Sequence, residues 1–203
     1  VFRIRCEFKT TFDLAGLEKL GIVKMDILSL DAIAKIRSVE GMTGARFSTD
    51  MLEDEAVYNA FCNGDTDGVF QFEKYGAKNI LGRVKPRGIQ DLIACNALNR
   101  PAPLQLGIVD EFIAAKDGQE SDSIWADYTR DTYGTIVYQE HVMAICRDMA
   151  QMEWPDVDKV MKSLRQTAVV GRDPLRKKFV SGAVKFSGVT KAEATDLYKK
   201  MTL

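Results

Sequence analysis

Two closely spaced prolines constrain the fold of this chain more than any other feature. Pro101 and Pro103 lie within the stretch Asn99–Gly107, separated by one residue. Each proline fixes φ and lacks a backbone donor, so the sequence predicts that no helix runs through this point. The residue before a proline favours extended backbone, which places Arg100 on a stiff turn. Apolar residues recur at helical spacing on both sides, so we expect this turn to connect two helices.

Two roles are compatible with Arg100. A guanidinium held on a rigid turn between helices is well placed to bind a phosphate group through two parallel hydrogen bonds. Alternatively, the stretch is an ordinary interhelical connector whose arginine caps a helix carbonyl. These residues alone leave both interpretations open.

Composition excludes several classes of protein. The chain has 203 residues, of which 46% are hydrophobic and 28% charged, as is typical of a globular protein. No apolar run approaches the roughly 20 residues of a membrane-spanning helix. The four cysteines are far apart and His141 is the only histidine, so we expect neither a zinc site of the usual type nor a disulfide framework. A reducing cytoplasm is the simplest location.

Positive charge is concentrated near the C-terminus, although the net charge of the whole chain is only −1. Residues 159–200 contain 11 lysines and arginines and three acidic residues, which leaves a charge of +8. This asymmetry predicts either a surface that binds a polyanion or a solvated helical face.

The hydrophobic periodicity predicts a mainly α-helical chain with a small β element at its N-terminus. Residues 1–8 and the stretch 22–28 are typical of short strands. On a strand, Lys24 and Asp26 would face the same side, either as a site for anions and a metal ion or as the polar face of an edge strand. We expect a turn at 63–68, a surface loop at 116–127, and helices near 14–20, 31–39, 54–62, 73–83, 139–149, 155–165, and from 173 and 189 onward.

Four stretches together resemble one family. They are GIVKMDILSL (21–30), GDTDGVFQFE (64–73), ALNRPAPLQLGIVD (97–110) and TYGTIVYQEHVM (132–143). In this order and at this spacing they are similar to the last palm strand and three fingers blocks of the bacterial DNA polymerase III α subunit, a C-family replicative polymerase. Asn99 stands where an aromatic residue is usual, and Ala102 where glycine is usual, which indicates a divergent branch.

The resemblance implies a fragment of a DNA-directed DNA polymerase. Residues 1–40 would be the C-terminal part of the palm, and 41–203 a helical fingers domain that is incomplete at its C-terminal end. Asp26 would be one of three catalytic aspartates that hold two Mg²⁺ ions, the other two lying outside this chain. Lys24 and Arg100 would contact the incoming nucleotide. The residues expected to contact DNA are Lys162, Arg165, Arg172, Arg176, Lys177 and Lys178.

The resemblance also implies partners and leaves alternatives. The partners would be primer–template DNA, deoxynucleoside triphosphates, the remainder of the polymerase chain and, through regions absent here, the sliding clamp and other replisome subunits, with no membrane. Because one aspartate cannot hold two metal ions, we expect the fragment alone to be inactive. The alternatives are a non-catalytic nucleic-acid-binding helical module and a split-gene subunit that needs a palm-bearing partner.

Overall fold

The computed structural model describes residues 10–25, 27–118, 123–164 and 172–202. The chain divides into two compact units, Val1–Phe47 and Ser48–Leu203. Among the described residues, the secondary structure is entirely helical, and no helix is long and apolar enough to cross a bilayer. These observations confirm the predicted mainly α-helical class.

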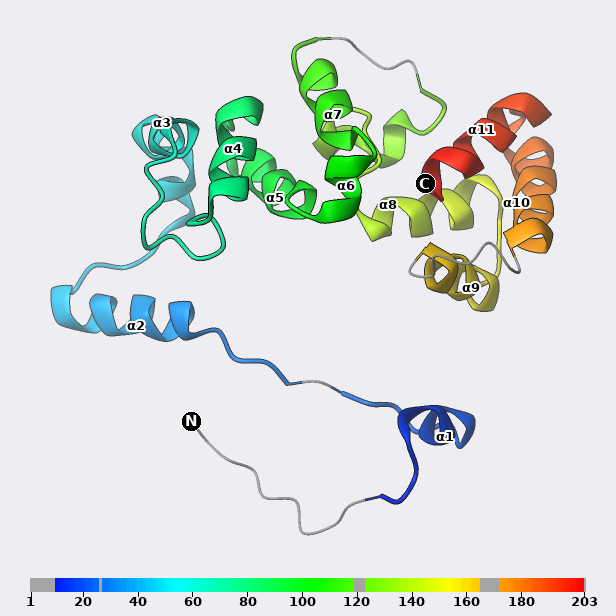
Figure 1. Ribbon diagram of the computed structural model, residues 1–203, viewed down its shortest axis with the longest axis horizontal. Helices are drawn as coiled ribbons and strands as arrows, with labels where there is room; N and C mark the ends of the chain where they lie inside the picture. Colours follow the sequence, from blue (N-terminus) through cyan, green and yellow to red (C-terminus); the bar gives the residue numbers. More distant parts are fainter. Residues whose placement is uncertain (1–9, 26, 119–122, 165–171, 203) are drawn as a thin grey trace. The chain divides into compact units, whose positions relative to one another are not determined.

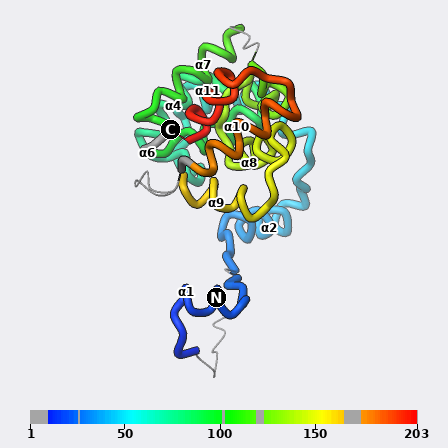
Figure 2. The backbone as a smooth tube through the Cα atoms, turned by 90° about the vertical axis from the view of Figure 1, so that its right-hand side faces the viewer, coloured from blue at the N-terminus to red at the C-terminus, as the bar shows by residue number. Residues whose placement is uncertain are grey.

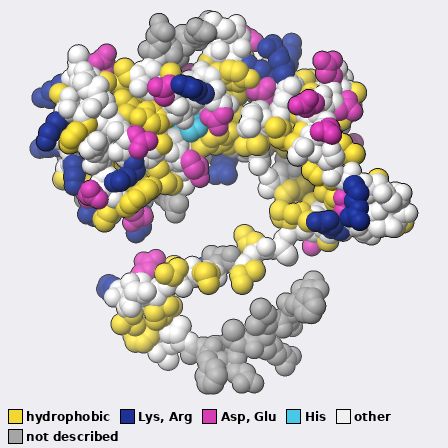
Figure 3. Space-filling model, turned by 180° about the vertical axis from the view of Figure 1, so that it is seen from behind, with side chains coloured by type: hydrophobic (Ala, Val, Ile, Leu, Met, Phe, Trp, Pro, Cys, Tyr) yellow, Lys and Arg dark blue, Asp and Glu magenta, His cyan; other side chains and the backbone are white. Residues whose placement is uncertain are grey.

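The first unit contains two helices, α1 (Leu14–Lys19) and α2 (Asp31–Thr43), and none of its described residues is buried. Asp13 caps α1 by accepting a hydrogen bond from the Gly16 amide (2.7 Å), as expected for an N-cap. The segment between the helices exposes a row of apolar side chains, visible in Figure 3, among which Ile27 and Leu28 are 88% and 89% exposed.

The β element predicted at the N-terminus is not found among the described residues. Residues 1–8 lie outside them, and residues 22–25 and 27–30 have no regular secondary structure. A strand exists only when a neighbouring strand accepts and donates its backbone hydrogen bonds, and no described part of the chain offers one.

The second unit is built from short helices joined by tight turns (Figures 1 and 2). In chain order they are η1 (Thr49–Glu53), α3 (Glu55–Asn63), α4 (Tyr75–Val84), α5 (Ile89–Leu98), α6 (Pro101–Gln105), α7 (Ile108–Lys116), η2 (Ala126–Tyr128), η3 (Arg130–Thr132), α8 (Gln139–Ala144), the π-helical turn η4 (Ile145–Met149), α9 (Trp154–Leu164), α10 (Arg172–Ser187) and α11 (Lys191–Met201).

Two hydrophobic clusters hold this unit together. One cluster lies between α4, α5 and α7 and centres on Leu81, Leu98 and Phe112, all of which are fully buried. The other lies between the turn η4 and helices α8–α11 and includes Ile145 and Phe179. Several helices, such as α4 and α9, bury one apolar stripe and leave their polar face in solvent, as the sequence periodicity predicts.

The proline stretch differs from the prediction. Residues Pro101–Gln105 form the short helix α6, so the expectation that no helix passes through the two prolines is wrong. Both prolines lie in the first turn of α6, where backbone N–H groups have no partner within the helix and the fixed φ of proline suits the helix. The surface loop predicted at 116–127 also begins later than predicted, because Lys116 is the last residue of α7 and is buried.

Candidate nucleic-acid interface

Arg100 lines a polar pocket of about 550 Å³ in the second unit. The pocket lies between the turn that precedes α4 and the C-terminal end of α5. It brings together an aromatic ring, three amides, one acid and two cations: Phe70, Gln71, Asn96, Asn99, Glu73, Lys74 and Arg100. Cations can bind phosphates, amides can donate to and accept from a base edge, and an exposed ring can stack on a base.

The turn at 63–68 is confirmed, and it leads into the segment whose residues Phe70, Gln71, Glu73 and Lys74 form one wall of the pocket. Gly64 and Gly68 adopt positive φ (77° and 79°), which glycine tolerates. The buried Thr66 hydroxyl donates to the carbonyl of Phe72 (2.6 Å), which closes the turn. The turn leaves Phe70 59% exposed at the pocket.

Two residues of the segment 64–73 have a distinctive backbone or charge environment. Gln71 has a positive φ of 68°, a strained conformation for a residue other than glycine, and lies within the pocket lining. Asp67 pairs with Lys78 of α4 (2.7 Å), and this ammonium group lowers the pKa of Asp67 below its usual value. Asp67 therefore anchors the turn to α4.

The opposite wall is fixed by a buried ion pair. Lys116 of α7 binds Asp91 of α5 (2.7 Å), and the Tyr133 hydroxyl donates to the same carboxylate (2.9 Å). Burial and the bond to Asp91 raise the pKa of Tyr133 to about 12, so its hydroxyl remains a donor. Asn96 lies on α5 and Asn99 is the C-cap of that helix. The contacts of Asp91 with Lys116 and Tyr133 therefore hold this wall of the Arg100 pocket in place.

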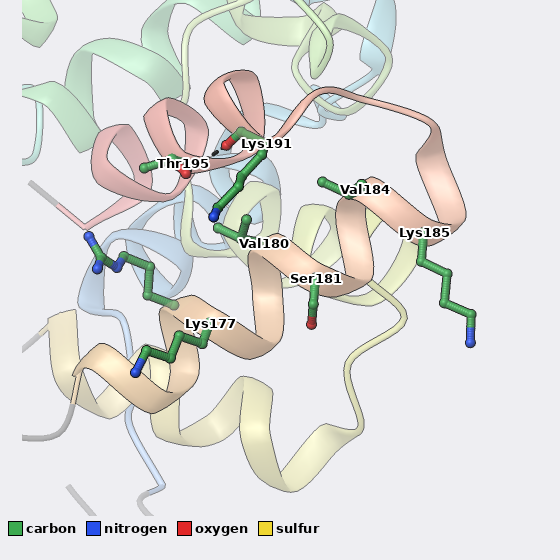
Figure 4. Close-up of a pocket in the computed structure, with 8 residues that line it drawn as sticks. Lys177, Val180, Ser181, Val184, Lys185, Lys191 and Thr195 are labelled. Carbon is green, nitrogen blue, oxygen red and sulfur yellow. Dashed lines mark hydrogen bonds between the residues drawn. The ribbon is translucent and has the colours of Figure 1, made fainter.

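A second surface is basic and lies between α10 and α11. These neighbouring helices enclose a groove of about 730 Å³ (Figure 4). Its lining consists of four cations, two hydroxyl groups and two valines: Arg176, Lys177, Lys185, Lys191, Ser181, Thr195, Val180 and Val184. Of the residues predicted to contact DNA, Arg176 and Lys177 line this groove.

The other predicted DNA-contacting residues lie elsewhere. Lys178 and Lys159 both pair with Asp156, and together they lower the pKa of that carboxyl, with the Lys178 hydrogen bond as the larger cause. Lys162 pairs with Asp158 (2.8 Å), so part of the positive charge on α9 is compensated. Arg165 lies outside the described residues, and Arg172 begins α10 with a side chain that is not described.

Comparison with known proteins supports one family. Residues 29–187 match the family described as bacterial DNA polymerase III alpha subunit finger domain. The chain belongs to this family. It is 33% identical over 188 residues to DNA polymerase III subunit alpha of Aquifex aeolicus, covering 88% of this chain and 16% of that protein.

Two further DNA polymerase III alpha subunits show the same relationship. The protein of Bacillus subtilis is 33% identical over 205 residues (95% of this chain, 18% of that protein), and that of Campylobacter jejuni is 31% identical over 201 residues (94% and 17%). The chain thus spans less than a fifth of the length of these relatives. The match confirms the predicted membership in the polymerase III α fingers family.

The predicted palm residues are in the other unit. Lys24 lies in the exposed segment between α1 and α2, and Asp26 lies outside the described residues. Within the described part of the chain, no group of three histidine, cysteine or acidic side chains is arranged to hold a metal ion. The predicted magnesium site therefore stays a prediction.

The sequence analysis did not single out several residues of the two surfaces. Phe70, Gln71, Lys74 and Asn96 line the Arg100 pocket, and Lys185 and Lys191 line the groove. For the groove, the sequence did contain a helical repeat of polar residues. Lys177, Ser181 and Lys185 are spaced four positions apart, which places them on one face of α10. For the pocket no local signal exists, since its two walls come from segments about 25 residues apart.

Proposed function

We propose that this chain serves in a bacterial replicative DNA polymerase, as the part that receives the incoming deoxynucleotide during template-directed extension of a primer. The observation that supports the proposal best is the pocket around Arg100, which combines cations, amides and an exposed aromatic ring in a member of the fingers family. Each component of a nucleoside triphosphate has a matching group there.

In this proposal, Arg100 and Lys74 bind the triphosphate and stabilise the negative charge that develops on it when the nucleotide is transferred to the primer. Phe70 provides a stacking surface for a base, and the amides of Asn96 and Asn99 contact polar edges. By its resemblance to a triphosphate-binding lysine of the family, Lys24 is proposed as a further contact to the nucleotide.

The chemical step in this proposal needs magnesium. Asp26 would hold it together with two aspartates from the remainder of the polymerase, and Mg²⁺ favours such carboxylate oxygens. Two bound ions would supply the charge that activates the primer oxygen and neutralises the leaving pyrophosphate. We therefore propose that the chain alone does not extend a primer, and that it works in the cytoplasm with the remaining polymerase chain, the sliding clamp and other replisome subunits.

The second candidate function is a non-catalytic nucleic-acid-binding module, and the basic groove between α10 and α11 favours it. Here Arg176, Lys177 and Lys178, with Lys162, Arg165 and Arg172, would contact the DNA backbone, and binding would weaken steeply with salt. A split-gene subunit completed by a palm-bearing partner is a third arrangement that uses both surfaces.

Titration of the chain with a fluorescent deoxynucleoside triphosphate in Mg²⁺ tests the proposal. We expect Arg100→Ala to weaken binding at least about tenfold, as for loss of a charge-assisted hydrogen bond. Arg130→Ala is the matched control, because Arg130 is exposed and pairs only locally with Asp127. Equal affinity of both variants and the unmodified chain would contradict the nucleotide role, whatever the chain does with DNA.

A further inference from the structure

The groove between α10 and α11 has an apolar floor and a cationic rim. Val180 belongs to the buried cluster between η4 and helices α8–α11 and also reaches the groove, whereas Val184 is 39% exposed there. Figure 4 shows Lys177 and Lys185 toward the two ends of α10, and Lys191 extending from α11 toward Val180. Within the described residues, no acidic side chain lines the groove.

The hydroxyl groups of the groove are already used inside the protein. Ser181 donates to the carbonyl of Lys178 (3.0 Å), and Thr195 donates to the carbonyl of Lys191 (2.6 Å). A ligand in the groove therefore meets chiefly the ammonium groups of Lys177, Lys185 and Lys191 and the methyl groups of the floor. Such a lining selects a ligand that carries anionic groups beside an apolar surface.

Single-stranded DNA has this combination, whereas duplex DNA does not. In a duplex the base faces stack on each other inside, so that phosphates, sugars and base edges, but not base faces, are accessible. In a single strand the base faces are accessible beside a phosphate on every nucleotide.

The spacing of the cations agrees with an extended polyanion. Lys177 and Lys185 are eight residues apart on α10, which corresponds to about 12 Å along the helix. Lys191 adds a positive charge from the facing helix, so a strand in the groove meets cations on both sides and along its length. In the part of the chain that the structure describes, no aromatic side chain lines the groove, so base contacts would be apolar and tolerant of sequence.

We infer that the groove between α10 and α11 binds a single-stranded DNA segment, with phosphates at Lys177, Lys185 and Lys191 and bases against Val180 and Val184. This inference rests on the proposed function and specifies the form of DNA that this surface takes. In a polymerase, such a surface suits an unpaired stretch of template rather than the finished duplex.

Fluorescence anisotropy with an oligothymidylate and with a hairpin duplex of equal nucleotide number tests this inference. We expect the unmodified chain to bind the single strand at least about tenfold more tightly. Lys185→Gln/Lys191→Gln should weaken single-strand binding and reduce the salt slope, d log K/d log[salt], by about 1.4, at about 0.7 for each phosphate contact. Val184→Asn should weaken binding without changing that slope.

The matched control is Lys159→Gln/Lys199→Gln, which removes the same charge from residues outside the groove. Circular dichroism shows whether each variant keeps its helices. Equal losses of single-strand affinity in the groove and control variants would overturn the inference. So would an acidic Glu/Leu peptide that binds the groove more tightly than oligothymidylate, which would assign the groove to a protein partner.

The remaining outcomes separate the inference from the proposed function. If the duplex binds as tightly as the single strand and the groove variant weakens both, the strand preference is wrong while the nucleic-acid role stands. If neither DNA binds, both the inference and the DNA-contacting role fail. The triphosphate titration of Arg100 is unaffected by either result.

Discussion

The ammonium group of Lys116 lies 2.7 Å from Oδ2 of Asp91, and the two side chains are only 2% and 3% exposed. Lys116 also donates to the carbonyls of Val84 (2.9 Å) and Lys85 (2.7 Å), so all three of its donors are used. The pair therefore ties the end of α7 to α5 and to the turn that follows α4.

Removing one member of this pair should destabilise the protein strongly. Lys116→Met leaves the Asp91 carboxylate buried without its counter-ion, which costs about 3–5 kcal/mol. Urea unfolding followed by circular dichroism measures this change. The exposed pair Arg130–Asp127 is the control, and Arg130→Ala should change the free energy of unfolding by less than about 1 kcal/mol.

The double variant Asp91→Leu/Lys116→Met separates the charge from the packing. Because it removes both charges together, its cost should be smaller than the sum of the two single variants by about 1–3 kcal/mol. Additive costs would show that the two residues stabilise the fold independently, which would contradict a coupled pair.

A close backbone approach makes Gly182 of α10 essential for packing. A Cβ atom at this position would lie 2.2 Å from the carbonyl oxygen of Ala150, which is impossible without moving a helix. Gly182→Ala should therefore lower the free energy of unfolding by about 3 kcal/mol or more, because the clash is with backbone. Gly82 of α4 is the control, since its Cβ would meet Cys62 at an ordinary 3.7 Å, and Gly82→Ala should stabilise by about 0.5–1 kcal/mol.

Local sequence signals predicted the helices well. Apolar periodicity was sufficient to predict α3, α4 and α11, and Thr190 with Glu193 forms a capping box that can be read from the sequence. The polar turn at 63–68 was equally visible, because Gly64 and Gly68 supply the positive φ that it needs. These features depend on neighbours within four residues.

Features that depend on distant partners were not predicted. Lys116 appeared to begin a surface loop because its partner, Asp91, lies 25 residues earlier in the chain. Val184 is 39% exposed and lines the groove between α10 and α11, which no local pattern indicates. Of the Arg100 pocket, the sequence indicated a possible role only for Arg100, because the walls of the pocket meet by tertiary packing.

His141 should make stability depend on pH. Its Nδ1 accepts from the backbone amides of Val137 and Tyr138 (both 3.3 Å), and its Nε2 lies 3.2 Å from Asp131. Burial lowers the pKa of His141 below its usual 6.5, and the Asp131 carboxylate opposes this shift only in part. The folded protein therefore binds the proton more weakly than the unfolded chain does.

The sign of the effect follows from this difference. As the pH falls through about 6.5, the unfolded chain takes up a proton that the folded chain refuses, so the free energy of unfolding falls, by at most about 1.4 kcal/mol per pH unit. Thermal unfolding between pH 7.5 and about 5.5 measures this slope. Because His141 is the only histidine, His141→Gln should flatten it. Stability that rises on acidification would show instead that Asp131 dominates.

The cysteines should differ in reactivity by position. Burial raises the pKa of Cys95 and of Cys146 to about 12, so at pH 8 only about one thiol in ten thousand is the reactive thiolate, and neither is accessible to reagent. Cys62 is partly exposed. Iodoacetamide should therefore modify Cys62 in the native protein and spare Cys95 and Cys146, as peptide mass spectrometry can establish, whereas in urea these two should react as well. Native modification of Cys95 as fast as Cys62 would mean that the cluster between α4, α5 and α7 opens readily, which the buried Asp91–Lys116 pair argues against.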